Sequence, residues 1–266
     1  MGSYGEIRPT LKISLITLNA ALYASVGYLT YLGLFTPIFG TVRFWPAVVV
    51  PALFSILFSP WIGGIGAAIG IFISDMVIHG NPLLSLSVGV PSNFLGFYTI
   101  GVLARRWHKP GAGKLVAAIT IQLIPLILSW LLYYLGLIEE SVALIFFITA
   151  LLVFGFGSIV ALARRDYLGI LYASSIGLMV GSAIIGLGLW GFSQFFVLPI
   201  GEVKNAPLIA AVVWFLWTYL TEIPFLYFIL PPLIYAIVRA MPQLATRALG
   251  KVEEVCLLYT SDAADE

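Results

Sequence analysis

Charged residues are scarce in this chain. Of its 266 residues, 13 are Lys or Arg and 12 are Asp or Glu, so charged residues make up 9% of the sequence, against 61% hydrophobic residues. Soluble domains carry about 25% charged residues. A soluble domain of this composition would have almost no polar surface, so the composition excludes that class of protein.

Cysteine is almost absent as well. The single cysteine, Cys256, lies in the last eleven residues, 256–266 (CLLYTSDAADE). This stretch matches, in one frame, the translation of the mosaic-end adapter used in transposon-based sequencing libraries. We therefore expect residues 256–266 to be an artefact, and the natural protein to continue beyond Val255. Residues 1–255 are interpreted as one integral membrane domain with no disulfide and no cysteine metal site.

Catalytic and metal-binding motifs are also missing. The sequence has no HExxH, P-loop or GxSxG pattern. Its two histidines, His79 and His108, are expected on opposite faces of the membrane, where they cannot share a metal ion. The sequence predicts a protein that is not an enzyme and that uses no cofactor.

Long apolar stretches are what the chain has instead. Most of them can cross a hydrocarbon core of about 30 Å, which takes about 20 helical residues. The stretches are continuous rather than alternating, which favours helices over barrel strands. They predict an all-α, polytopic membrane helix bundle of about eight transmembrane helices, at 11–34, 44–59, 61–79, 84–104, 115–136, 141–163, 167–197 and 208–240.

The Lys and Arg residues lie almost entirely in alternate gaps between these stretches. The gaps on one side of the membrane contain only two basic residues, Arg43 and Lys204. Positive charge gathers on the cytoplasmic side of membrane proteins, so both termini are expected in the cytoplasm. The residues of that side are Arg8, Lys12, Arg105, Arg106, Lys109, Lys114, Arg164, Arg165, Arg239, Arg247 and Lys251.

Three ionisable residues lie within or at the rim of the apolar stretches. Inserting a charged side chain into the middle of a membrane helix costs a free energy of roughly 2.5–3.5 kcal/mol. Such a residue therefore usually marks a functional site or a pair with another residue of the protein. Arg43 and Asp75 are expected at similar depth near the outer face, because the second and third stretches form a hairpin. They either pair with each other or contact a ligand. Glu222 lies about halfway along the last stretch.

Glycine and proline patterns predict how the helices pack. Gly66 with Gly70 and Gly177 with Gly181 form GxxxG motifs, for which we expect tight packing within the bundle. The stretch 208–240 would be about 50 Å long if straight. It contains Pro224, Pro231 and Pro232, so a kinked or broken helix is expected there.

Together these features predict an outward-facing cavity for a small, flat, polar metabolite. Aromatic walls would supply stacking area, and a few polar groups would fix its orientation. An aromatic belt and hydrogen bonds between helices are the structural alternatives for the tryptophans and for the asparagine. The predicted ligand-binding residues are Arg43, Trp45, Asp75, Asn93, Trp217 and Glu222.

The order of features in residues 15–106 resembles the substrate-binding (S) component of energy-coupling factor (ECF) vitamin transporters. NAALYASVG carries Ala20 and Ala24, similar to the small-residue motif of that family. It is followed by TPIFGTVRFWP, the turn SPWIGG, a glycine-rich span ending in ISD, and PSNFLGFYTIGVLARR.

The resemblance implies a binding subunit in a prokaryotic plasma membrane that captures a small vitamin-like or nucleobase-like metabolite from outside. Its partners would be a transmembrane coupling subunit, docked on Ala20 and Ala24, and two cytoplasmic ATPase subunits. The family core has six helices, so two of the eight stretches would be an added pair, either the fifth and sixth or the seventh and eighth. If the fifth and sixth are added, the last two stretches become core helices five and six. The sequence leaves the cargo open.

Two other functions stay open. Sensory modules that precede histidine kinases or cyclases also have about eight spans with an early Trp-Pro helix, and a signalling domain would then follow Val255. A stand-alone proton-coupled transporter using Asp75 and Glu222 is the third hypothesis.

Overall fold

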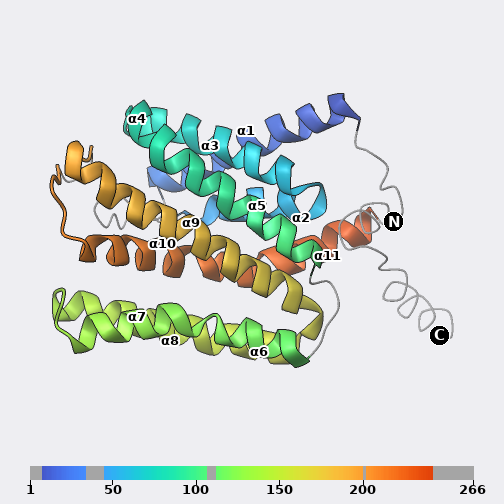
Figure 1. The fold of residues 1–266 in the computed structure, drawn as a ribbon. Helices are drawn as coiled ribbons and strands as arrows, with labels where there is room; N and C mark the ends of the chain where they lie inside the picture. Colours follow the sequence, from blue (N-terminus) through green and yellow to red (C-terminus); the bar gives the residue numbers. More distant parts are fainter. Residues whose placement is uncertain (1–7, 34–44, 107–111, 200–201, 242–266) are drawn as a thin grey trace.

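The computed structural model describes residues 8–33, 45–106, 112–199 and 202–241, and every regular element in these ranges is helical (Figure 1). The long helices run alongside one another in a bundle. In chain order the elements are α1 (Pro9–Gly33), η1 (Pro46–Val48), α2 (Val49–Leu57), α3 (Pro60–Ile78), α4 (Pro82–Leu84), the π-helix η2 (Ser85–Gly89), α5 (Val90–Arg106), α6 (Ala112–Thr120), α7 (Leu123–Tyr134), α8 (Glu140–Ala163), η3 (Arg165–Tyr167), α9 (Leu168–Phe195), α10 (Ile209–Phe228) and α11 (Leu230–Ala240).

Seven helical segments in the described part of the chain are long and apolar enough to cross a membrane, and the chain is a multi-pass membrane protein. The stretch expected at 44–59 is different, because its helices η1 and α2 have only 3 and 9 residues. That is about 20 Å, less than a hydrocarbon core of about 30 Å. Most side chains of α2 are buried, so neighbouring helices rather than lipid surround it.

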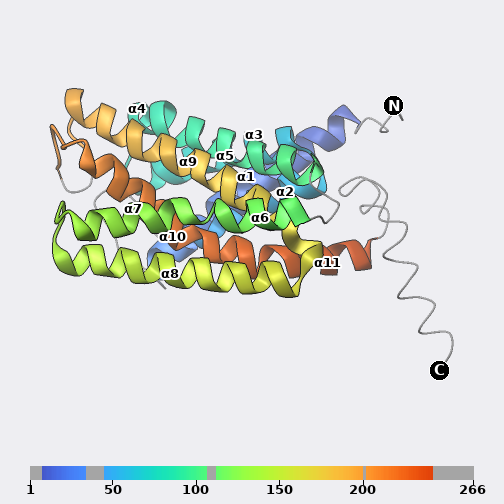
Figure 2. The same ribbon diagram turned by 60° about the horizontal axis from the view of Figure 1, so that its bottom comes forward.

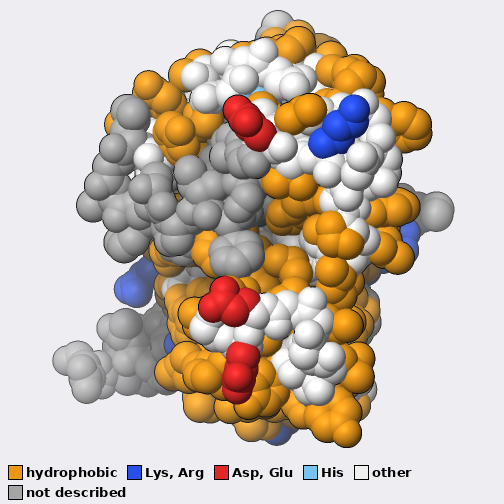
Figure 3. Space-filling view, turned by 90° about the vertical axis from the view of Figure 1, so that its left-hand side faces the viewer, with side chains coloured by type: hydrophobic (Ala, Val, Ile, Leu, Met, Phe, Trp, Pro, Cys, Tyr) orange, Lys and Arg blue, Asp and Glu red, His pale blue; other side chains and the backbone are white. Residues whose placement is uncertain are grey.

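The two ends of the bundle differ in charge. α1 begins and α11 ends at the same end, on the right in Figure 1. The described cations of this end are Arg8, Lys12, Arg105, Arg106, Lys114, Arg164, Arg165 and Arg239. Figure 3 looks at the opposite end, where acidic side chains are more prominent than basic ones among the charged residues. The described charged residues in the two connections there are Glu139, Glu140, Glu202 and Lys204.

The GxxxG motifs pack helices of this chain against one another, as expected. A Cβ atom on Gly70 of α3 would lie 2.8 Å from the carbonyl oxygen of Ala20 on α1. A Cβ atom on Gly96 of α5 would lie 3.1 Å from the carbonyl oxygen of Gly177 on α9. Only glycine allows such close contact between helix backbones.

The structure buries the predicted docking face at Ala20 and Ala24. These side chains are only 3% and 9% exposed, because the bundle itself covers this side of α1. The sequence predicts close helix contacts both for the small residues of α1 and for the glycines of α3. In the structure these two sets pack against each other. The same face is therefore not free for a second protein.

The last apolar stretch is broken, as its prolines predict. Pro224 lies inside α10, which ends at Phe228, and α11 starts again at Leu230 with Pro231 in its first turn. A proline lacks the N–H that would bond to the carbonyl four residues earlier, so the carbonyl of Leu220 loses its helical partner. The carbonyl that loses its partner lies two residues before Glu222.

The segment from α6 to α8 forms a layer along one side of the bundle (Figures 1 and 2). Its helices pack mainly on one another and on α9 and α10. In the rest of the bundle, the closest contacts are those among α1, α3, α5, α9 and α10.

Candidate ligand-binding cavity

A cavity lies between α1, α3, η2, α5, α9 and α10. The centre of a water-sized sphere can occupy about 110 Å³ of it. One water needs roughly 10–15 Å³ on that scale, so the cavity has room for a small metabolite. No described residue of α6, α7 or α8 lines it. The lining residues are Tyr23, Trp45, Ile71, Asp75, His79, Leu84, Val88, Gly89, Ser92, Asn93, Gly96, Phe97, Ile100, Gly177, Leu178, Gly181, Ser182, Ile185, Leu189, Pro199, Thr218 and Glu222.

The cavity lies toward the end of the bundle that is opposite to the basic residues. Asp75 and His79 come from the end of α3, while Leu189 and Pro199 come from the end of α9 and the connection after it. In Figure 1 both helices finish at the left, and the basic residues lie at the right. The lining residues therefore place the cavity nearer the acidic end than the basic end.

The structure brings together most of the residues predicted to bind a ligand. Those that line the cavity are Trp45, Asp75, Asn93 and Glu222. Arg43 lies outside the described residues.

Trp217 is not among the lining residues. Its ring packs near Phe146 of α8, with the ring centroids 6.4 Å apart. Thr218 and Glu222 are four residues apart and share the cavity side of α10. Trp217 is one residue before Thr218, and one residue turns the side chain by about 100° around the helix. Its predicted role in closing the cavity is therefore wrong.

Aromatic side chains form one wall. Tyr23 of α1 meets Trp45 edge-to-face, with centroids 6.1 Å apart and planes at 87°. Tyr23 contacts Phe97 of α5 in a similar way, at 5.9 Å and 76°. Gly27 leaves the space for the indole, because a Cβ atom there would overlap the Trp45 ring. These contacts fix the rings before any ligand enters.

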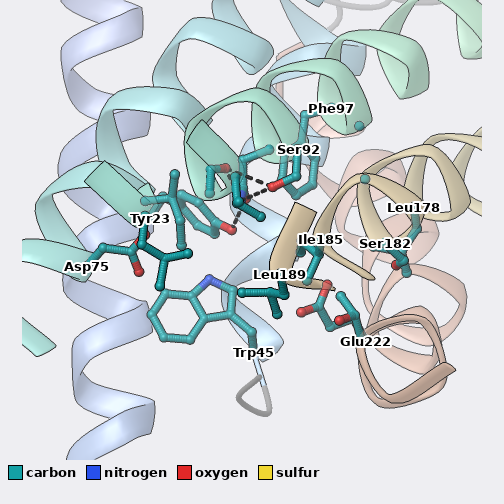
Figure 4. A pocket seen from close by; sticks show the side chains of 18 of the residues that line it. Tyr23, Trp45, Asp75, Ser92, Phe97, Leu178, Ser182, Ile185, Leu189 and Glu222 are labelled. Atoms are coloured by element: carbon teal, nitrogen blue, oxygen red, sulfur yellow. Dashed lines mark hydrogen bonds between the residues drawn. The ribbon is translucent and has the colours of Figure 1, made fainter. Parts of the chain in front are cut away.

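Asn93 joins α1 to α5. Its Oδ1 accepts a hydrogen bond from the Tyr23 hydroxyl at 2.6 Å, and its Nδ2 donates to the carbonyl of Gly89 at 2.9 Å. The Ser92 hydroxyl donates to the same carbonyl at 2.8 Å. Figure 4 shows this network at the upper edge of the cavity. The hydrogen bond between helices that was the structural alternative for Asn93 is therefore present, and Asn93 also faces the cavity.

Asp75 is held by two neighbours. Its Oδ2 accepts a hydrogen bond from the Ser85 hydroxyl at 2.7 Å, and its Oδ1 lies 3.3 Å from Nε2 of His79. The backbone N–H of Asn81 donates to Nδ1 of His79 at 3.2 Å. Nδ1 of His79 therefore faces the backbone of the following turn, and Nε2 faces Asp75.

The α10 side of the cavity is polar too. Glu222 is 7% exposed and lies across the cavity from Asp75 (Figure 4). One turn earlier, the Thr218 hydroxyl donates to the carbonyl of Trp214 at 2.8 Å. Ser182 of α9 is fully buried beside them.

Several lining residues were not predicted to bind the ligand. His79 follows Asp75 by four residues, and that spacing on one helix was a usable signal. Tyr23 precedes Ala24 in a segment interpreted only as a contact surface. Ser182 gave no signal, because a serine inside a transmembrane helix usually bonds to its own backbone.

Ser85 and His79 both contact the carboxylate of Asp75. Ser85 donates to the carboxylate instead of to the imidazole, so His79 does not activate that hydroxyl. Within the described residues, no three His, Cys, Asp or Glu side chains lie close enough to hold a metal ion. Comparisons of the chain with protein-family models, with curated proteins and with solved structures find no match.

Proposed function

We propose that this chain is the substrate-binding component of an ECF-type importer, which captures a small vitamin-like or nucleobase-like metabolite from outside the cell. The observation that carries the proposal is the position of the cavity. It lies toward the acidic end of the bundle, and the basic end is the cytoplasmic one by the positive-inside rule. A solute captured from outside would enter this end.

The composition of the cavity supports a binding role. Its walls are largely apolar and aromatic, with a few polar groups placed by neighbouring helices, as in most small-molecule sites. The lining comes from five long helices and from the residues next to η1, which correspond to the first four and last two predicted spans. These are the six spans of the family core if the fifth and sixth stretches are the added pair.

In this proposal the chain does not move its solute alone. A transmembrane coupling subunit and two cytoplasmic ATPase subunits would drive transport, and both termini of the chain would lie in the cytoplasm. The membrane would be the plasma membrane of a prokaryote.

Uptake by proteoliposomes tests the proposal. Vesicles that contain the chain, a coupling subunit and two ATPases should take up a labelled metabolite from a vitamin and nucleobase panel only when ATP is present. Vesicles that lack the coupling subunit are the control. Uptake by the chain alone, driven by a proton gradient, would overturn the proposal.

The second candidate is a stand-alone proton-coupled transporter. It is favoured by the two buried carboxyl groups, Asp75 and Glu222, that face one cavity. The same vesicles separate the candidates, since this one predicts gradient-driven uptake without ATP.

A further inference from the structure

Glu222 is a buried carboxyl group without a protein partner. It is 93% buried, and no residue in the described part of the chain forms a hydrogen bond or an ion pair with it. It lines the cavity, and Figure 4 shows its carboxyl oxygens beside Ile185 and Leu189. Burying an uncompensated carboxylate is costly, so such a group is expected to meet a partner during function.

Ser182 is a second unpaired group beside it. Its hydroxyl is fully buried and has no hydrogen-bond partner in the described part of the chain, although it lines the same cavity. The Ser175 hydroxyl, two turns earlier on the same helix, bonds to the carbonyl of Leu171 at 2.7 Å. Ser182 therefore lacks the bond that a helical serine usually makes, and it is left with hydrogen-bonding capacity for a ligand.

The opposite side of the cavity is already satisfied. Asp75 accepts bonds from Ser85 and His79, and the amide of Asn93 is bonded to Tyr23 and Gly89. Unmet polar capacity is thus present where α9 and α10 meet the cavity. None of the described lining residues is Lys or Arg, and a ligand that carries a cation would balance the charge of Glu222.

We infer that the ligand is a small, single-ring aromatic cation, whose positive nitrogen pairs with Glu222 and whose ring lies near Trp45. Figure 4 places the indole of Trp45 between Asp75 and Glu222. Cations are attracted to the faces of tryptophan and tyrosine rings, and more strongly where water is excluded. This inference names the substrate class of the site in the proposed function and rests on that function for its biological meaning.

A charge series on one ring tests the inference. 1-Methylnicotinamide, nicotinamide and nicotinate share a six-membered aromatic ring and carry positive, no and negative charge. In calorimetric titrations of the purified chain, 1-methylnicotinamide should bind roughly 10- to 100-fold more tightly than nicotinamide, the range expected for an ion pair and a cation–π contact away from water. Nicotinate should bind weakest.

Substitution assigns that preference to Glu222. Glu222→Gln keeps the shape and removes the charge, so it should abolish the preference for the cation. Glu139→Gln removes the same charge from an exposed position at the same end of the bundle and should leave the preference intact. Equal affinities for the three compounds, tighter binding of nicotinate, or no binding of 1-methylnicotinamide at millimolar concentration would overturn the inference.

Thermal unfolding without ligand gives an independent test. Because Glu222 has no protein partner, Glu222→Gln should unfold at the same or a higher temperature than the unchanged chain. Asp75→Asn is the matched control and should unfold at a lower temperature, because an NH2 group, which cannot accept a hydrogen bond, replaces one of the two oxygens that face Ser85 and His79. A lower unfolding temperature for Glu222→Gln would show a structural role and overturn the inference.

The outcome for the ligand is separable from the outcome for the importer. All these measurements use the chain alone in detergent and require no coupling subunit. A chain that binds the cation but shows no ATP-dependent uptake keeps the inference and loses the proposed function. A chain that imports an anionic metabolite with ATP keeps the function and loses the inference.

Discussion

Two glycines leave the space that the side chains of the cavity occupy. Gly27 of α1 makes room for the indole of Trp45, and Gly89 of η2 lies beside Asp75. A Cβ atom on Gly89 would lie 2.7 Å from Oδ2 of Asp75, the atom that accepts the Ser85 hydroxyl. The π-helix η2 ends at this glycine. Single π-helical turns often occur at functional sites, and here the turn carries both Ser85 and Gly89.

Gly89→Ala should therefore displace the Asp75 carboxylate. We expect a loss of about 1–3 kcal/mol in the free energy of unfolding from overpacking, and weaker ligand binding. Gly155→Ala is the control, because Gly155 lies in α8 with open space around its missing side chain. That change should leave the free energy of unfolding unchanged or raise it by up to about 1 kcal/mol. Thermal unfolding and ligand titration of the two variants measure the difference, and equal behaviour would contradict the crowding argument.

The residues that could be predicted share one property. Asp75, Asn93 and Glu222 are polar groups inside apolar stretches, and their cost in lipid marks them without knowledge of the fold. Trp217 could not be placed, because a rotation of about 100° per residue decides which neighbour it meets. The unpaired state of Ser182 depends on bonds that only coordinates reveal.

At the level of elements, α1 has two faces that the sequence alone does not distinguish. Asn19, Ala20 and Tyr23 face the bundle, and Asn19 donates to the carbonyls of Ile62 and Gly63 on α3. Thr17, Ala21 and Ser25 are also small and four residues apart, and they are exposed. Both sets fit the pattern of close helix packing. Which set is free depends on where α3 lies.

If a coupling subunit docks on α1, it should use the exposed set. The double change Ala21→Leu and Ser25→Leu should block capture of the coupling subunit and leave ligand binding intact, since close contact of helices in lipid depends on small side chains. Co-purification and ligand titration of the same sample measure both properties.

The buried set supplies the contrast. Ala20→Leu would force a larger side chain between α1 and α3, so it should lower the unfolding temperature and ligand binding as well as capture. Unchanged co-purification with Leu at both positions 21 and 25 would count against docking on this helix.

At the scale of the whole molecule, the number and position of apolar stretches were predictable because lipid accepts few alternatives to apolar helices. The sequence did not show that the η1–α2 segment is surrounded by other helices rather than by lipid, because hydropathy does not distinguish these two apolar surroundings. α1 and α3 run in the same direction in Figure 1, so the chain returns between them, and η1–α2 forms the described part of that return.

The side of the membrane on which the basic end lies decides which way the cavity faces. The basic ends of α5 and α8 lie at one end of the bundle, and the start of α8 lies at the other. A cytoplasm-active reporter fused after Arg106 or after Arg165 should be active, and one fused after Glu140 should be silent, because the basic residues stay in the cytoplasm. A reporter active only outside the cytoplasm, fused at the same three positions, should give the reverse pattern. Cytoplasmic activity after Glu140 would place the acidic end in the cytoplasm, and the cavity would then face a compartment from which no nutrient is captured.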